Sequence, residues 1–300
     1  MTKTTAIQKS TETVKSERRK FSISKVFIYI FLSLWALTTI YPFIWVILNS
    51  FREKGLIRSD SFSLPLGSSF TYDNYQTAFD RVDILGAYKN SLIISISVTL
   101  AVMILAGFAA YGMARFNFKG KKALHSLIIA SMMFPVFSTI IPVFRMMYDW
   151  HIVNTNSVTL SQISVILPQI AGNLSFSIVV LMGFIRSLPV DLEEAAYLEG
   201  CSIYQIFFKV ILPITKPSFA TVAIFTFLWS YNDLFTQMFF LRFRDAFTIT
   251  RLLNEISSIA GVNYGLMAAA VVLVVVPVLI VYVFLQKNII KGMTAGAIKG

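Results

Sequence analysis

The sequence predicts an all-α polytopic membrane protein with six transmembrane helices and a cytoplasmic helix-turn-helix between the fourth and fifth of them. Three observations lead to this prediction. The composition is strongly apolar, six stretches are long enough to cross a bilayer, and one charged amphipathic segment, residues 191–217, interrupts the apolar pattern.

The composition separates this chain from soluble proteins. Of its 300 residues, 56% are hydrophobic and 14% are charged, and the mean hydropathy is +0.70. Soluble domains are nearer half apolar and a quarter charged. The net charge of +11 could indicate a nucleic-acid partner. However, the basic residues collect beside the ends of apolar runs and no water-soluble domain is visible, so we expect no nucleic-acid partner.

Residues typical of metal and redox sites are scarce. Cys201 is the single cysteine, and the two histidines, His125 and His151, are far apart in the sequence. A lone thiol cannot form an internal disulfide and provides no metal-ligand spacing. We therefore predict no metal site and no cofactor.

Six stretches can serve as transmembrane spans, because about 20 apolar residues cross ~30 Å of hydrocarbon. Polar residues dilute the fourth stretch, and the fifth contains one acid, Asp233. We expect a six-span domain over residues 26–286, with the first span as a retained anchor. Residues 1–25 are predicted to be a disordered tail, and residues 287–300 a second tail. The expected spans are 26–48, 91–114, 124–144, 163–185, 218–241 and 265–285.

The distribution of basic residues predicts the orientation. One face, made of both tails and the second and fourth connections, carries 17 of the 26 Lys and Arg residues. Cytoplasmic segments are enriched in these residues. We therefore expect a multi-pass protein of the cell membrane with both termini, and residues 191–217, in the cytoplasm.

The first half of the segment 191–217 predicts a short capped helix. Pro189 ends the fourth span, and Asp191 stands where an N-cap belongs, with Glu194 three residues later as in a capping box. Gly200 can take the left-handed conformation that ends a helix.

The second half predicts another amphipathic helix. Ser202 and Gln205 form a second capping box, Pro213 is expected to end this helix, and Pro217 precedes the fifth span. From the residues alone, two interpretations stay open: a hairpin that only connects spans, or a docking surface for a soluble partner.

Here the sequence resembles a known family. The segment contains EAA, then three residues, a glycine, a hydrophobic run and the pair LP. This pattern is similar to the signature loop of the membrane subunits of ATP-binding-cassette importers. The longer segments AAYGMARFNFKGKK, FTYDNYQTAF and QKNIIKGMTAGAIKG resemble its carbohydrate branch, specifically the smaller, maltose-type second permease. The resemblance runs from about Leu48 to Gly300, and only the charged tail before residue 25 departs from it. The signature positions here are Glu194, Ala195, Ala196, Gly200, Leu212 and Pro213.

The resemblance implies a coupling role for this hairpin. Glu194 would pair with a cation of a cytoplasmic ATPase, the small alanines would allow close approach, and Ile203 and Phe207 would pack beneath. The last residues, Thr294, Ala295 and Gly296, would reach the interface of an ATPase dimer. The implied partners are a second homologous permease, two ATPase copies, an extracellular solute-binding protein, a carbohydrate substrate and the lipid bilayer.

Asp233 marks a candidate pathway or gate in the fifth span. Carboxylates inside a membrane are expensive and by default face a cavity or a partner. Its neighbours Trp229, Tyr231 and Asn232 would suit sugar hydroxyls and C–H faces. Direct contact with the ligand, and a gate or hydrogen bond between helices, both remain open.

The sequence gives no sign of catalysis. No phosphate loop of the form GxxxxGK[ST], no HExxH and no Gly-x-Ser-x-Gly with suitable partners is present, so the chain is predicted not to be an enzyme, and ATP would be hydrolysed by another chain. Alternatives are an ion-coupled secondary transporter, an importer permease for a non-sugar solute and, least favoured, a membrane enzyme. The sequence does not identify the sugar.

Overall fold

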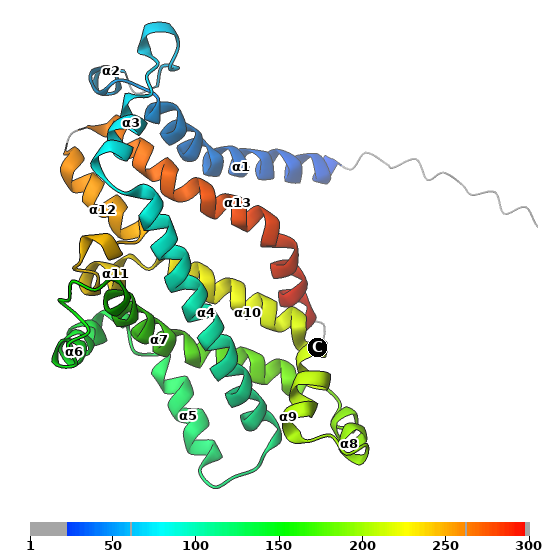
Figure 1. The fold of residues 1–300 in the computed structure, drawn as a ribbon. Helices are drawn as coiled ribbons and strands as arrows, with labels where there is room; N and C mark the ends of the chain where they lie inside the picture. Colours follow the sequence, from blue (N-terminus) through cyan, green and yellow to red (C-terminus); the bar gives the residue numbers. More distant parts are fainter. Residues whose placement is uncertain (1–22, 61, 262, 298–300) are drawn as a thin grey trace, which may run out of the picture. The chain divides into compact units, whose positions relative to one another are not determined.

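The computed structural model describes residues 23–60, 62–261 and 263–297 (Figure 1), and within these ranges the ordered elements are helices. Arg52 and Phe70 form an isolated antiparallel bridge. The helices are α1 (Ile23–Ser50), α2 (Lys54–Ser59), η1 (Gly67–Ser69), α3 (Asp73–Arg81), α4 (Ile84–Arg115), α5 (Lys121–Ser131), α6 (Val136–Asp149), α7 (Val158–Arg186), α8 (Asp191–Leu198), α9 (Ile203–Ile206), η2 (Phe207–Ile211), α10 (Leu212–Asn232), α11 (Leu234–Phe240), η3 (Arg244–Ala246), α12 (Ile249–Ala260) and α13 (Tyr264–Ala297).

The chain divides into two units, Met1–Trp45 and Val46–Gly300. The first contains most of α1, which has no charged residue from Val26 to Leu48. The predicted disordered tail, 1–25, lies almost wholly outside the described residues. The remainder of this section concerns the second unit.

The core of the second unit is the packing of α4 against α7 and α10, with α13 beside α10 and α12 (Figure 1). The buried face of α4 carries small or β-branched residues at helical spacing, including Ser91, Ser95, Val98, Val102 and Ala106. Such residues let backbones approach closely, which is how helices associate in lipid where burial of apolar surface gives little driving force.

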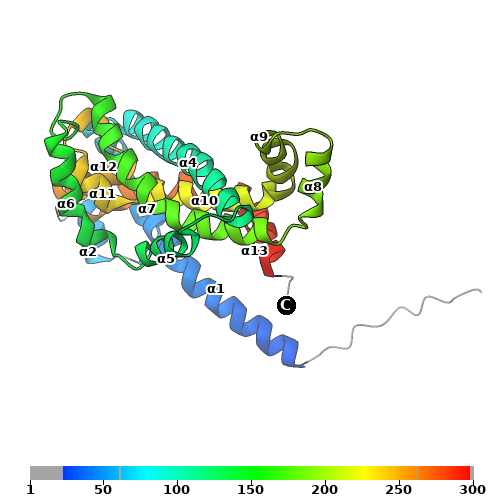
Figure 2. The same ribbon diagram turned by 90° about the horizontal axis from the view of Figure 1, so that it is seen from below.

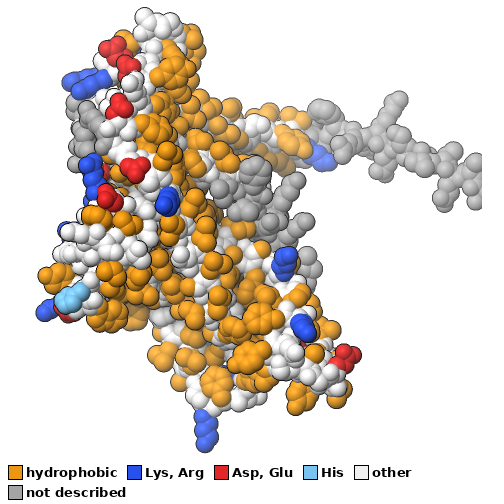
Figure 3. Space-filling model, in the orientation of Figure 1, with side chains coloured by type: hydrophobic (Ala, Val, Ile, Leu, Met, Phe, Trp, Pro, Cys, Tyr) orange, Lys and Arg blue, Asp and Glu red, His pale blue; other side chains and the backbone are white. Residues whose placement is uncertain are grey.

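Within the described ranges, four helices are long and apolar enough to cross a bilayer, and α13 contains a further, shorter apolar stretch over Tyr264–Ile280. The four are Ser24–Ser50, Ile84–Arg115, Val158–Arg186 and Ile203–Asn232. In Figure 3 the surface between the two ends of the second unit is mainly hydrophobic, and most of the visible acidic side chains gather toward the end that carries α2 and α3. The predicted all-α polytopic membrane protein is confirmed at this level.

Two of the expected spans are not single helices, which corrects the sequence prediction. The third, 124–144, is divided into α5 and α6 by a break over residues 132–135, where Pro135 provides no amide hydrogen. The fifth, 218–241, is divided at Asp233 into α10 and α11. Both stretches are continuously hydrophobic, but hydrophobicity indicates which residues are compatible with lipid and does not determine where the backbone departs from a helix.

The last helix is longer than the expected sixth span. α13 continues from Tyr264 to Ala297, so most of the predicted tail, 287–300, is helical. Thr294, Ala295 and Gly296 lie near the end of this helix, and residues 298–300 lie outside the described residues.

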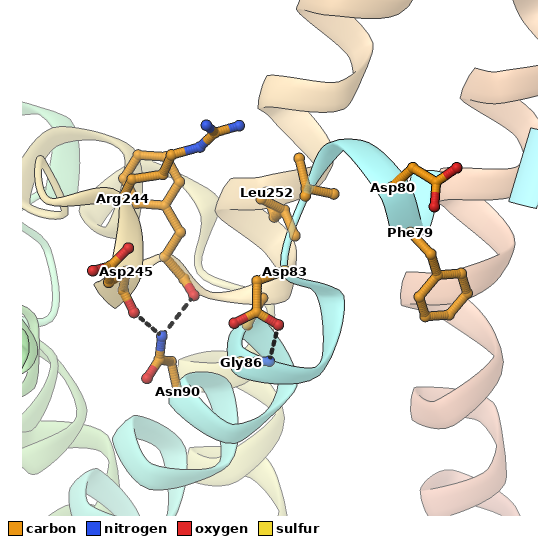
Figure 4. Close-up of a pocket in the computed structure, with 11 residues that line it drawn as sticks. Phe79, Asp80, Asp83, Gly86, Asn90, Arg244, Asp245 and Leu252 are labelled. Carbon is orange, nitrogen blue, oxygen red and sulfur yellow. Dashed lines mark hydrogen bonds between the residues drawn. The ribbon is translucent and has the colours of Figure 1, made fainter. Parts of the chain in front are cut away.

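The end of the unit opposite α8 is held together by amide side chains (Figure 4). Asn90 Nδ2 donates to the carbonyl oxygens of Asp245 and Phe247 at 2.8 and 3.0 Å, and Asn90 Oδ1 accepts from Gln162 Nε2 at 2.9 Å. Asp83 caps α4 by accepting from the Gly86 amide at 2.8 Å. A cavity of about 430 Å³ lies between these segments. The loop that follows the first expected span, 49–90, and the loop that precedes the last expected span, 242–264, therefore meet at one end of the bundle.

We predict that Asn90→Ala destabilises the protein by about 1–3 kcal/mol, because it leaves two carbonyls and the Gln162 amide buried without a partner. Thermal unfolding of the detergent-purified protein measures this loss. Asn254→Ala, which removes an exposed amide, is the matched control and should stay within about 0.5 kcal/mol of wild type. Equal stability of the two variants would contradict the role given to Asn90.

Candidate functional site

Within the segment 191–217, residues 191–207 form a helical hairpin, here called the α8–α9 hairpin, with Phe207 as its last residue. α8 and α9 pack on each other at one end of the bundle (Figure 2). Gly200 adopts φ +84° directly after the α8 C-cap, Glu199, a conformation that side-chain-bearing residues rarely take. Ser202 and Gln205 form the predicted capping box, with Ser202 N donating to Gln205 Oε1 at 2.8 Å.

Two details of the predicted hairpin are wrong. The N-cap of α8 is Val190, without a side-chain cap, because Asp191 has already entered the first turn of the helix. Pro213 does not end the second helix, since Ile203–Asn232 runs on as one helix through the π-helical turn η2. Proline is tolerated at the N1 or N2 position of α10, where its missing amide hydrogen costs little.

The predicted coupling residues divide between an exposed surface and a buried base. Glu194, Ala195, Gly200 and Pro213 are exposed, whereas Ala196 and Leu212 are half-buried. Ile203 is 49% exposed and Phe207 is 4% exposed. A groove of about 610 Å³ runs along this surface and is lined in part by Glu194, Tyr197, Leu198 and Ile203. Leu198 is 87% exposed, so an apolar side chain stands out beside an acidic one.

A buried ion pair ties the hairpin to the end of α4. Glu193 Oε1 accepts from Arg115 Nε at 2.5 Å, and Glu193 Oε2 accepts from Tyr111 Oη at 3.0 Å. Arg115 Nη2 also donates to the Leu188 carbonyl at 3.1 Å. Both charged side chains are 10% exposed. Removing one partner of a buried pair costs about 3–5 kcal/mol, because it leaves the other charge uncompensated.

An aromatic cluster forms a second link between the hairpin and α4. The Phe207 ring stacks on Phe108 with centroids 4.8 Å apart and contacts Tyr111 at 5.4 Å. Gly107 allows this approach, because a Cβ there would lie 3.0 Å from the Phe219 ring and 3.4 Å from the Phe207 ring. α4 therefore contacts the hairpin over two helical turns.

A second polar cluster satisfies the backbone where α10 breaks. Asp233 caps α11 by accepting from the Thr236 amide at 3.0 Å, and its other oxygen accepts from Gln169 Nε2 at 2.9 Å. The freed Ser230 carbonyl accepts from Gln237 Nε2 at 2.9 Å. Gln169 and Gln237 are buried. Broken helices at membrane depth need such partners and occur where the backbone is enclosed by protein or lines a cavity.

A concavity of about 390 Å³ lies beside this break. Its polar lining comes from Gln169, Asn173, Ser230, Asp233 and Thr236, and its aromatic lining from Phe137, Trp229 and Phe235. The Trp229 ring is 47% exposed and packs edge-on against Phe176 at 4.9 Å. We call this surface the α7–α10 concavity.

The four predicted pathway residues do not act as one group. Trp229 and Asp233 line the α7–α10 concavity, whereas Tyr231 is buried on another side of α10, stacked on Phe227 at 5.9 Å. Asn232 is exposed and donates to the Leu228 carbonyl of its own helix at 2.8 Å. Of the two roles left open for Asp233, the hydrogen bond between helices is present.

Residues 103–295 match the family described as binding-protein-dependent transport system inner membrane component. The chain belongs to this family. Two of its relatives are a permease protein of a diacetylchitobiose uptake system from Streptomyces coelicolor, 34% identical over 95% of this chain and 91% of that protein, and a permease protein of a galactooligosaccharide transport system from Bacillus subtilis, 30% identical over 93% and 96%.

A solved structure has the same fold as this inner membrane component. It is a bacterial ABC transporter involved in alginate import, which superposes with a TM-score of 0.74 over 88% of this chain and 96% of that one, at 21% identity. As a member of this transport family, the chain is a transport subunit and not an enzyme, as the sequence predicts. Among the residues that the structure describes, no cluster of His, Cys, Asp and Glu could hold a metal ion.

The sequence prediction missed three residues that define this site. The sequence pattern singles out the exposed Glu194 and not its neighbour Glu193. It assigns no individual role to Arg115 or Gln169. One signal was available: Tyr111 and Arg115 are four residues apart and therefore share a helix face, which presents a hydrogen-bond donor and a cation together.

We predict that Phe207→Ala lowers the stability of the protein by about 3–5 kcal/mol, because it empties the space between α4 and the hairpin. Phe208→Ala is the matched control: Phe208 is 52% exposed, and its loss should cost about 1 kcal/mol or less. Thermal unfolding followed by tryptophan fluorescence measures both. Similar losses for the two variants would show that Phe207 is not the residue that joins these elements.

Proposed function

We propose that this chain is a permease subunit of an ATP-binding-cassette importer that takes up an oligosaccharide. With a second homologous permease it forms the translocation pathway, and it couples to a cytoplasmic ATPase. The observation that carries the proposal is the α8–α9 hairpin, an exposed, rigid structure between two candidate spans of a chain in this transport family. The names of the diacetylchitobiose and galactooligosaccharide relatives support the substrate class.

The proposed topology has six crossings in the cell membrane. α1, α4, α7 and α13 each cross as one helix, α5 and α6 together make the third crossing, and α10 with α11 the fifth. Both termini and the α8–α9 hairpin lie in the cytoplasm. The concentration of 17 of the 26 basic residues on that face supports this orientation.

Coupling occurs at the exposed surface of the hairpin. Each of two ATPase copies receives one permease, and Glu194 meets a cation of the ATPase while Ala195 and Ala196 allow close approach. The exposed Tyr197 and Leu198 supply apolar contact area beside that charge. Thr294, Ala295 and Gly296 at the end of α13 contact the same ATPase pair. ATP hydrolysis takes place on those partner chains.

The opposite end receives a solute-binding protein. Loops 49–90 and 242–264 are joined there through Asn90, so a partner that presses on one displaces the other. A solved bacterial alginate transporter in complex with a pentasaccharide-bound periplasmic protein has a similar fold, with a TM-score of 0.62 at 16% identity.

The carbohydrate passes along the α7–α10 concavity. An exposed Trp229 ring offers a face for sugar C–H groups, and the side-chain oxygen of Asn173 offers an acceptor for hydroxyls. The break at Asp233 lies beside this surface, as expected for a backbone that lines a cavity. An ion-coupled transporter is disfavoured, because the oxygens of Asp233 already accept hydrogen bonds from Thr236 and Gln169.

We predict that Glu194→Arg lowers the affinity for the ATPase at least tenfold, since a reversed charge at a docking surface is repelled by a cationic partner site. Co-purification of the ATPase with the tagged permease, and ATP-dependent uptake into proteoliposomes, measure the effect. Glu199→Arg is the control on the same helix, and it should retain binding within about twofold. Normal association and uptake of the Glu194 variant would reject docking through this hairpin.

We predict that Trp229→Ala reduces oligosaccharide uptake by about twofold to tenfold, the equivalent of losing an aromatic contact of about 0.5–1.4 kcal/mol. The assay follows uptake of labelled diacetylchitobiose and galactooligosaccharides by the assembled transporter. Trp150→Ala removes a similarly exposed indole outside the concavity and should leave uptake unchanged. A wild-type rate for the Trp229 variant with every sugar transported would place the carbohydrate elsewhere.

A further inference from the structure

We propose that Glu193 is the positioning residue that fixes the α8–α9 hairpin to α4, so that a displacement of the hairpin is delivered to α4 before it reaches α10. This inference rests on the proposed coupling function and adds to it the receiving helix and the residue that makes the connection. Glu193 touches neither the solute nor nucleotide, and it acts through Arg115 and Tyr111.

The first support is the completeness of the Glu193 contacts. Each carboxylate oxygen has a donor on α4, and Arg115 reaches back to the Leu188 carbonyl in the connection that leads into α8. The Glu193 side chain is therefore held from two positions one turn apart on α4. Glu193 is 8% exposed, so a movement of its side chain away from α4 would break its bonds to both Arg115 and Tyr111 and leave a buried charge without a partner.

The second support is the aromatic contact made by Phe207. It meets α4 at Phe108 and Tyr111, so the two links together span residues 107–115 of one helix. Because the hairpin is attached to α4 both by the Glu193 ion pair and by the Phe207 ring, it cannot rotate about one contact without breaking the other.

The third support is the irregular helix geometry between the hairpin and α10. The helix there passes through the π-helical turn η2, and π-bulges are among the recognised sites of kinks in α-helices. Thr215 Oγ1 bonds the Ile211 carbonyl at 2.6 Å within this stretch, and prolines 213 and 217 interrupt the amide ladder that follows. The helix between the hairpin and α10 can therefore bend after Phe207, whereas Glu193 and Phe207 hold the hairpin on α4.

The properties of α4 make it a suitable receiver. It is 32 residues long, which corresponds to roughly 48 Å at 1.5 Å per residue. Its far end carries Asn90, which holds the loop at Asp245 and Phe247. Movement of α4 at the hairpin is thus passed to the surface where the solute-binding protein is proposed to dock, and in the reverse direction as linkage requires.

The test compares Glu193→Gln, Arg115→Gln and the double variant in the assembled transporter reconstituted in proteoliposomes. ATPase association, ATPase turnover and sugar uptake per ATP are measured for each. We expect association within about twofold of wild type, because the exposed docking surface is unchanged. Uptake per ATP falls at least fivefold in either single variant, and the double variant is no worse than the singles, as for residues that act as one unit. Glu199→Gln on the same helix is the matched control and retains the wild-type ratio.

The variant Tyr111→Phe tests the proposal in the case that Glu193→Gln and Arg115→Gln do not fold. It keeps the ring in the aromatic cluster and removes one hydrogen bond to Glu193, so it should lower uptake per ATP in the same direction but less strongly. An unchanged uptake per ATP in Glu193→Gln and Tyr111→Phe overturns the proposal, as does a loss of ATPase association equal to that of Glu194→Arg. If Glu194→Arg itself binds the ATPase normally, the proposed docking function fails instead, whatever the Glu193 variants do.

Discussion

In hydrocarbon every backbone amide and carbonyl needs a partner within the protein, and this constraint determines the rest of the structure. It makes the described spans helical, and it means that each departure from helix must bring its own donors and acceptors. At the α10–α11 break, Asp233, Gln169 and Gln237 supply them. Buried polar side chains are thus concentrated where the helices are interrupted, and one of these interruptions adjoins the α7–α10 concavity.

The same logic explains why the α8–α9 hairpin has two chemically different sides. Its outer side exposes Glu194 and Leu198, as suits a surface that meets a soluble partner. Its inner side buries Glu193 and Phe207 against α4. There the buried charge of Glu193 is balanced by the ion pair with Arg115, and the Phe207 ring is packed against the Phe108 ring. Two adjacent glutamates therefore have opposite environments, buried for Glu193 and exposed for Glu194, because successive helix positions are rotated by about 100°.

Family membership and geometry contribute separate parts of this picture. The match over residues 103–295 makes the chain a transport component, and the alginate transporter gives the fold. Neither says how force crosses from the hairpin into the bundle. The contacts at Tyr111, Arg115 and Phe207 address that question, and they point to α4, which joins the α8–α9 hairpin to the loops at the opposite end through Asn90.

The sequence by itself determined the membrane class, the existence of the spans expected over 91–114 and 163–185, the hairpin with its Gly200 turn and the Ser202 capping box, because these depend on composition, periodicity and neighbouring residues. Only the tertiary structure decided that Pro135 and Asp233 divide expected spans, that Tyr231 faces away from Asp233, and that Glu193 pairs with Arg115. The last pair is separated by 78 residues, and no local pattern encodes which distant donor will neutralise a buried carboxylate. That choice is made by the packing of α4 against α7 and α10, which brings the two side chains to the same place.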